Sequence, residues 1–241
     1  MTNDFVILIP SRIGSTRLPN KPLVNLRGKT LIQRVFEQAL RATPKSFIAT
    51  DSKLIFDHAK SFTDNIVMTS DSHISGTDRV FEAASKLSLN PDQLIINLQG
   101  DEPFMPVDLV TSLVDDFDNN QCDVISASHP IKSRDDINNP NCVKVLADNN
   151  YADDFIRIPN KEPLELLRRH IGIYGYSFKT LEKLVALEPS KRELDYKLEQ
   201  LRFLDNNYSI YVSPYAHSIQ SGIDTQDDVD AAILYLNKND N

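Results

Sequence analysis

The chain has 241 residues and a formal net charge of −8. This length allows an α/β protein with a sizeable buried core. The acidic balance argues against a nucleic-acid partner, and no apolar run approaches the roughly 20 residues that a membrane helix needs. The first residues lack the basic start and long apolar run of a signal peptide, so we expect a cytoplasmic protein without membrane insertion.

The first half of the chain alternates short apolar runs with segments of helical spacing. Continuous apolar runs are typical of strands buried on both faces of a parallel sheet. Strands are predicted at 5–9, 46–49, 66–68 and 94–98. Helices are predicted at 31–40, 53–62, 78–87 and 107–117. Thr30 stands where it can cap the first of these helices.

The second half continues the alternation, except for a polar stretch with two prolines at 149–165, which we expect to be an irregular excursion over the active face. Further strands are predicted at 123–127, 143–146, 171–176 and 208–212. Further helices are predicted at 178–187, 192–205 and 225–236. This order predicts an α/β fold with a doubly wound, mostly parallel sheet, in a single domain spanning 1–241.

The loop after the first strand gathers positive charge in an acidic protein. It contains Arg12, Arg17 and Lys21 together with several hydroxyl groups. Guanidinium groups bind phosphate oxygens in pairs, and an ammonium adds a mobile point charge. The loop has neither the Walker pattern nor the three-glycine dinucleotide fingerprint. It therefore predicts a site for a small anion, with a solvated basic turn as the alternative.

Two aspartates follow glycines at positions that suit a metal ligand. Asp101 comes directly after Gly100 at the end of a predicted buried strand, and Asp224 precedes the last helix. Carboxylate oxygens together with phosphate are the ligands that Mg²⁺ prefers. The alternatives are a simple turn at Asp101, and at Asp224 a turn residue next to a helix capped by Thr225.

Three other segments carry polar groups that could contact a ligand. Small residues at 75–79 would allow a flat ring or a sugar to approach, or the segment could simply cap a helix through Thr77 or Asp78. His170 opens a predicted strand, where a structural histidine is the commoner case. Glu199 and Gln200 could point inward to a ligand or form the wet face of their helix.

Taken together, these segments resemble the 3-deoxy-manno-octulosonate (KDO) cytidylyltransferase family over almost the whole chain. The matching motifs are P-S-R-x-x-S-T-R-L-P-x-K-P-L, S-G-T-D-R, Q-G-D-E-P, R-H-x-G-I-Y-G-Y, L-E-Q-L-R and D-T-x-D-D. The resemblance implies transfer of CMP from CTP to the anomeric hydroxyl of KDO, with release of pyrophosphate, for lipopolysaccharide biosynthesis. It also implies a nucleotide-diphospho-sugar transferase fold, with a small lobe within 129–215 that makes a homodimer.

The resemblance also implies a role for individual residues, with Lys21, Arg17, Asp101 and Asp224 as the catalytic set. Nucleotide binding would fall to Pro10, Ser11, Arg12, Arg17, Lys21, Ser75, Gly76 and Arg79. Asp101 and Asp224 would carry Mg²⁺. The acidic eight-carbon sugar would be surrounded by Gln99, Arg157, His170, Tyr174, Glu199 and Gln200.

The chain departs from the family pattern on the predicted sugar side. The stretch 154–162 is shortened, and Lys191 and Arg192 replace more acidic and apolar residues. Ser11 stands where alanine is usual, which is a minor change. These departures leave open an 8-amino derivative of KDO as substrate. The further alternatives are an activity like that of CMP-sialic acid synthetase and a non-catalytic nucleotide-binding scaffold.

Overall fold

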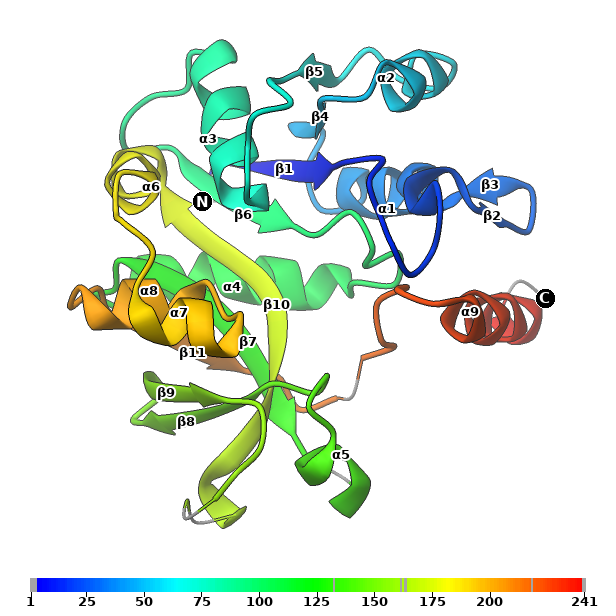
Figure 1. Ribbon diagram of the computed structural model, residues 1–241. Helices are drawn as coiled ribbons and strands as arrows, with labels where there is room; N and C mark the ends of the chain where they lie inside the picture. The colour runs from blue at the N-terminus through cyan, green and yellow to red at the C-terminus, as the bar shows by residue number, and fades with distance from the viewer. Residues whose placement is uncertain (1–3, 132, 161, 163, 218, 240–241) are drawn as a thin grey trace. The chain divides into compact units, whose positions relative to one another are not determined.

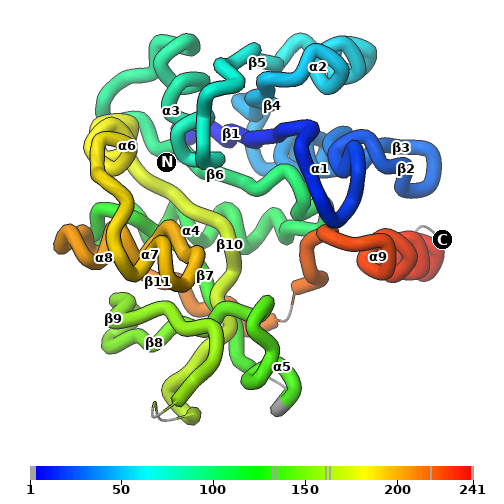
Figure 2. The backbone as a smooth tube through the Cα atoms, viewed as in Figure 1, coloured from blue at the N-terminus to red at the C-terminus, as the bar shows by residue number. Residues whose placement is uncertain are grey.

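The computed structural model describes residues 4–131, 133–160, 162, 164–217 and 219–239 (Figure 1). The chain forms two compact units, which can be followed along the backbone in Figure 2. The N-terminal unit combines 4–110 with 219–239, and the middle unit contains 111–217. The predicted smaller lobe, 129–215, falls within the middle unit. Both units mix helices with strands, which confirms the predicted α/β class.

The N-terminal unit contains four parallel strands in the order β5-β4-β1-β6. These strands are β1 (Phe5–Ser11), β4 (Ser46–Thr50), β5 (Ile66–Met68) and β6 (Leu94–Leu98). Every residue of β1 and β6 is buried, as expected for strands covered on both faces. All four overlap the predicted strands.

Of the four helices described within this unit, three begin at or next to the predicted positions and one, α3, begins two residues earlier; a further helix, α4, runs from this unit into the middle one. They are α1 (Leu31–Leu40), α2 (Lys53–Ala59), α3 (Gly76–Lys86), α4 (Val107–Asn119) and α9 (Gln226–Asn239). Thr30 accepts a hydrogen bond from Gln33 N, and Thr225 accepts one from Asp228 N, so both predicted caps are confirmed.

The cap of α3 differs from the prediction. Ser75, not Thr77 or Asp78, is the N-cap residue. Its hydroxyl accepts from Asp78 N, and the carboxylate of Asp78 accepts from Ser75 N in return. This reciprocal arrangement satisfies two amide groups at the start of the helix. It therefore places the helix start two residues earlier than predicted.

The basic loop after β1 is partly ordered into short elements, which the sequence interpretation did not foresee. A 3₁₀ helix, η1 (Lys21–Leu23), begins with Pro22 near its start and is followed by the small hairpin β2 (Asn25–Leu26) and β3 (Lys29–Thr30). Proline suits the first turn of a helix because its fixed φ is already helical. The η1 turn thereby fixes the position from which the Lys21 side chain leaves the backbone.

The middle unit has five strands in the order β10-β7-β11-β9-β8, and β10 also pairs with β8. Of these pairings only β7 with β11 is parallel, so the expected parallel arrangement describes the N-terminal unit and not this one. The strands are β7 (Val124–Pro130), β8 (Lys144–Asp148), β9 (Tyr151–Ile156), β10 (Leu167–Ser177) and β11 (Ile210–Pro214). The helical elements are α5 (Arg134–Asn138), η2 (Leu164–Leu166), α6 (Phe178–Val185), α7 (Lys191–Tyr196) and α8 (Gln200–Asp205).

The expectation that 149–165 is wholly irregular was wrong. Asn149 and Asn150 have φ values of 48° and 67° and turn the chain from β8 directly into the antiparallel strand β9. Two consecutive positive φ values match the twist of a tight hairpin, and asparagine tolerates them better than most residues.

The single predicted helix at 192–205 is instead two helices, α7 and α8, separated by Lys197 in a left-handed conformation (φ 54°). Arg157 donates hydrogen bonds to the carbonyl groups of Tyr196 and Lys197, which have no partner inside the ending helix. A side chain 40 residues away in sequence thus stabilises the break. No helix among the described residues is both long and apolar enough to cross a membrane.

Candidate active site

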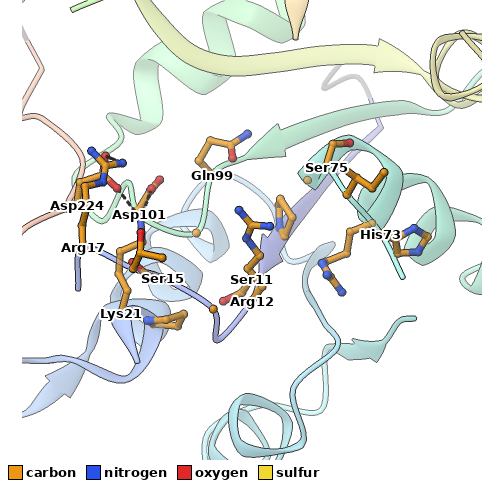
Figure 3. A pocket seen from close by; sticks show the side chains of 18 residues that line it. Ser11, Arg12, Ser15, Arg17, Lys21, His73, Ser75, Gln99, Asp101 and Asp224 are labelled. Atoms are coloured by element: carbon orange, nitrogen blue, oxygen red, sulfur yellow. Dashed lines mark hydrogen bonds and ion pairs between the residues drawn. The ribbon is translucent and has the colours of Figure 1, made fainter. Parts of the chain in front are cut away.

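A pocket of about 540 Å³ opens in the N-terminal unit where β1 and β6 end (Figure 3). Ligands of open α/β sheets bind at such carboxyl ends of strands. Four segments far apart in the chain line it: the loop after β1, the segment before α3, the loop after β6 and the turn before α9. All nucleotide-side residues predicted from the sequence line it, namely Pro10, Ser11, Arg12, Arg17, Lys21, Ser75, Gly76, Arg79, Asp101 and Asp224.

One end of this pocket holds a cluster of two cations and two carboxylates. Lys21 Nζ lies 2.6 Å from Asp101 Oδ2 and 2.9 Å from Asp224 Oδ1. Arg17 Nη2 lies 3.0 Å from Asp224 Oδ2. Figure 3 shows the four side chains pointing toward one another. The structure therefore brings the two predicted metal ligands together, although 123 positions separate them in the sequence.

The Lys21 ammonium remains charged in this cluster. Burial alone would lower its pKa, but the charges and hydrogen bonds of Asp101 and Asp224 outweigh burial and raise the pKa above its ordinary value. The Lys21 side chain is only 16% exposed, so its ammonium is largely withdrawn from water. We refer to Arg17, Lys21, Asp101 and Asp224 below as the charge cluster.

Two glycines allow the loops of the charge cluster to approach closely. A Cβ atom on Gly100 would lie 2.8 Å from the backbone oxygen of Pro10, and one on Gly222 would lie 2.7 Å from Glu102 Oε1. Ile223 N donates to the carbonyl of Asp101 at 2.9 Å, which joins the loop after β6 to the turn before α9. A side chain at Gly100 would thus collide with the backbone, whereas one at Gly222 would require the Glu102 side chain to move.

Replacing Gly100 with alanine is expected to destabilise the protein by about 1–3 kcal/mol, because the added methyl group meets a backbone carbonyl that cannot rotate away. Urea unfolding measures this loss. Gly14 lines the same pocket but has nothing within 4 Å of its Cβ position, so Gly14→Ala should change the stability by less than about 0.5 kcal/mol. Equal stability of the two variants would contradict the close approach.

Arg79 is buried, with 2% of its surface exposed, and its guanidinium is engaged within the protein. It donates to Asp51 Oδ2 and Thr69 Oγ1, both at 2.6 Å, and to the carbonyl of Ser70. These contacts fix the segment between β5 and α3 that forms one wall of the pocket. Arg79 is thus arranged to position this wall.

His73 and Ile74 line the pocket but were missed in the sequence interpretation. His73 Nε2 forms a short hydrogen bond with Glu82, which also accepts from Ser70 N. Burial would raise the pKa of Glu82, but Lys86, Ser70 and His73 together lower it to about 2. Ile74 is 90% exposed beside the pocket. The available signal was that both residues directly precede the S-G-T-D-R motif.

The residues predicted on the sugar side do not all lie in this pocket. Gln99 lines it, whereas Arg157, His170, Tyr174, Glu199 and Gln200 belong to the middle unit. Besides its two bonds at the end of α7, Arg157 donates to the carbonyl of Pro140 at 2.8 Å. These three bonds use three of the five N–H groups of the guanidinium.

His170 is held as a neutral, packed side chain. Its Nε2 lies 2.8 Å from Ser126 Oγ, and its ring packs against Phe155 and Tyr174 at centroid distances of 4.9 and 5.6 Å. Burial lowers the pKa of His170 to about 3. A base this weak is unsuited to removing a proton from a sugar hydroxyl near neutral pH.

Tyr174 interacts electrostatically with Glu199, the residue before α8. Burial, followed by the negative charge of Glu199, raises the pKa of the Tyr174 hydroxyl, so this group remains a hydrogen-bond donor. Gln200 is 4% exposed, so the amide points inward instead of lying on a wet helix face. The contact of these groups with a sugar stays a prediction.

Arg192, one of the departures from the family pattern, is used within the middle unit. Its guanidinium forms ion pairs with Asp154 and Asp205. These contacts, together with the attraction of both carboxylates, raise the pKa of Arg192 against the opposing effect of burial. The positive charge at this position is therefore neutralised by the protein and is no evidence for a changed sugar.

The cytidylyltransferase family profile matches residues 6–210. The chain belongs to the cytidylyltransferase family. It is 42% identical to a 3-deoxy-manno-octulosonate cytidylyltransferase of Francisella tularensis subsp. tularensis (strain FSC 198), over 93% of this chain and 95% of that protein. It is 38% identical to the protein of the same name from Saccharophagus degradans, over 94% and 96%.

A solved structure gives the same assignment for the fold of this cytidylyltransferase. It is that of a CMP:2-keto-3-deoxy-manno-octonic acid synthetase complexed with CTP. The two structures superpose with a TM-score of 0.90 at 32% identity, covering 98% of this chain and 99% of the other. The predicted nucleotidyltransferase class of enzyme is thereby confirmed.

Proposed function

We propose that this cytidylyltransferase transfers CMP from CTP to the anomeric hydroxyl of KDO and releases pyrophosphate. The observation that carries the proposal is the charge cluster at the carboxyl ends of β1 and β6. The relatives named 3-deoxy-manno-octulosonate cytidylyltransferase support it as well. A cluster of two cations and two carboxylates is suited to a polyphosphate bound with a divalent metal ion.

The cations of the cluster would bind the triphosphate and stabilise its developing charge. Lys21 supplies three donors on a flexible stem, and the planar guanidinium of Arg17 can bind two phosphate oxygens at once. Arg12 lies exposed in the same pocket and can meet the outer phosphates. As in other phosphoryl transfers, the protein contributes mainly by positioning the reacting groups and compensating their charge.

The opposite end of the pocket suits the nucleoside. Gly76 packs beside Pro10, with its Cβ position 3.4 Å from the proline ring, so this end is formed by small, flat groups. Arg79 holds the wall next to it through Asp51 and Thr69. Figure 3 shows Ser75 and His73 at this end, far from Asp224. His73 is thus a candidate contact for the nucleoside.

The donor set of the cluster fits Mg²⁺, which prefers oxygen ligands and several positions filled by phosphate or water. Asp101 and Asp224 would hold the ion, since an oxygen of each already lies within hydrogen-bonding distance of one and the same positive group. A bound magnesium ion would neutralise phosphate charge and lower the pKa of a coordinated hydroxyl. With Mg²⁺ bound, the reaction does not require His170 as a general base.

KDO is the proposed sugar because the curated relatives with this name extend over nearly the whole chain. An 8-amino derivative of KDO is the nearest alternative, because the stretch after Arg157 differs from the family pattern. The decisive measurement is pyrophosphate release from CTP and Mg²⁺ with KDO, 8-amino KDO and a sialic acid. We expect the highest kcat/KM with KDO. A higher kcat/KM with 8-amino KDO or with the sialic acid would identify that sugar as the substrate in place of KDO. If no pyrophosphate were released with any of the three sugars, a nucleotide-binding scaffold would be favoured.

The protein is further proposed to act in the cytoplasm, where CTP is available, and to serve lipopolysaccharide biosynthesis as a homodimer. Among the exposed large apolar side chains of the middle unit are Ile158, Leu164 and Leu166, with 49–54% of their surface exposed. Burial of these side chains against a second copy would favour association. Light scattering of the purified protein tests the dimer.

A further inference from the structure

We propose that Lys21 is an internal counter-ion that holds the metal position of the nucleotide-free enzyme, so that a divalent cation binds well only after CTP draws Lys21 away. The inference deepens the proposed function, since it concerns the order in which the same site accepts its two charged ligands. It rests on the contacts of the charge cluster.

The ammonium of Lys21 makes the contacts that a metal ion would need. Its nitrogen touches one oxygen of Asp101 and one of Asp224. Arg17 contacts the remaining oxygen of Asp224. A divalent cation that bridges the two carboxylates would therefore compete with Lys21 for the oxygens that face each other, Asp101 Oδ2 and Asp224 Oδ1.

Displacement is unfavourable as long as no other anion is present. The two cations and two carboxylates of the cluster cancel in formal charge. If a metal ion alone replaced Lys21, the freed ammonium would lie near a double positive charge without a partner. If a triphosphate alone entered, it would face the two carboxylates. When both ligands enter, the phosphates pair with Lys21 and Arg17 while the carboxylates pair with the metal ion.

The exchange is sterically simple. Lys21 leaves the rigid turn η1 and has four rotatable side-chain bonds, so its ammonium can swing to a phosphate while its backbone stays in place. The hydrogen bond from Ile223 N to the carbonyl of Asp101 joins the two loops without help from Lys21. The carboxylate pair should consequently persist after Lys21 is removed or displaced.

Binding of Mn²⁺ to the nucleotide-free protein tests the inference. It can be measured from the free-ion signal in electron paramagnetic resonance. Removing the positive charge in Lys21→Met or Lys21→Gln should tighten Mn²⁺ binding by roughly 5–150-fold, the usual range of coupling between sites. Lys21→Arg keeps the charge and should bind Mn²⁺ as weakly as the wild type. Lys29→Met, which removes an exposed lysine paired with Glu37, is the matched control.

The inference would be overturned if Lys21→Met and Lys21→Gln, both folded, bound Mn²⁺ no more tightly than the wild type does. Circular dichroism establishes whether each variant is folded. Two neutral substitutions are used so that the test remains possible if one of them does not fold. Adding Asp101→Asn to Lys21→Met should abolish the gain, which assigns it to this site. If the wild type failed to bind CTP in a separate titration, the proposed function would fall while the Mn²⁺ result remained interpretable.

Discussion

Replacing Asp101 with asparagine is expected to lower kcat by a factor of about 10²–10³. The substitution preserves the shape of the side chain but removes the negative charge that would hold the metal ion next to the reacting phosphate. Asp224 remains as a partner for Lys21, so the loops should keep their positions. Because Asp101 directly contacts only Lys21 in the cluster, the substitution affects the reacting end of the pocket and not the nucleoside end.

Steady-state pyrophosphate release at saturating CTP and sugar provides the measurement. Asp227→Asn is the matched control, because it makes the same chemical change at an exposed position of α9 that does not line the pocket. This control should retain kcat within a factor of about two to three of the wild type, as expected for a surface site. A loss of less than tenfold in Asp101→Asn would remove Asp101 from the catalytic set.

Replacing Arg79 with methionine is expected to cost about 3–5 kcal/mol of stability, because it leaves the largely, though not fully, buried carboxylate of Asp51 without the guanidinium that it contacts. The side chains of Arg79 and Asp51 are 3% and 16% exposed, so water cannot replace the lost guanidinium well. The wall between β5 and α3 should loosen as well, since Thr69 and Ser70 lose their donor. Weaker CTP binding is therefore expected along with the lower stability.

Urea unfolding of the whole chain measures the stability, and a CTP titration measures the second effect. Lys53→Met is the control, because it removes the solvent-exposed ion pair between Lys53 and Asp57. This substitution should cost no more than about 1 kcal/mol of stability. Adding Asp51→Asn to Arg79→Met should restore part of the loss by removing the unpaired charge. If the double variant were less stable by the sum of both single effects, charge pairing would not be the cause.

Much of the N-terminal unit could be predicted from the sequence, because its structure follows local rules. Continuous apolar runs predicted the strands β1 and β6. Threonines directly before helical segments predicted the caps at Thr30 and Thr225. The meeting of Asp101 with the basic loop followed from the rule that strand ends gather on one edge of a parallel sheet. These features depend on residues close together in sequence or on a general property of the fold.

The remaining features depend on contacts that the sequence does not display. The antiparallel pairings of β10 with β7 and of β11 with β9 join strands that are distant in the chain. The break at Lys197 is stabilised by Arg157, whose guanidinium contacts two backbone carbonyls about 40 residues away in the sequence. Lys21 was expected to meet phosphate, and its pairing with carboxylates 80 and 203 residues away becomes visible only after folding.

The N-terminal unit is built from two stretches of chain that are separated by the whole of the middle unit. During synthesis on the ribosome, the segment with Asp224 emerges only after residues 111–218 have been added, roughly 5–20 s later at about 5–20 residues per second. During this interval the chain contains the residues of β1 and β6 but not those of α9 and the turn before it. A nascent chain stalled in this interval would have Lys21 beside a single carboxylate, so the complete charge cluster can form only after the turn with Asp224 has been synthesised.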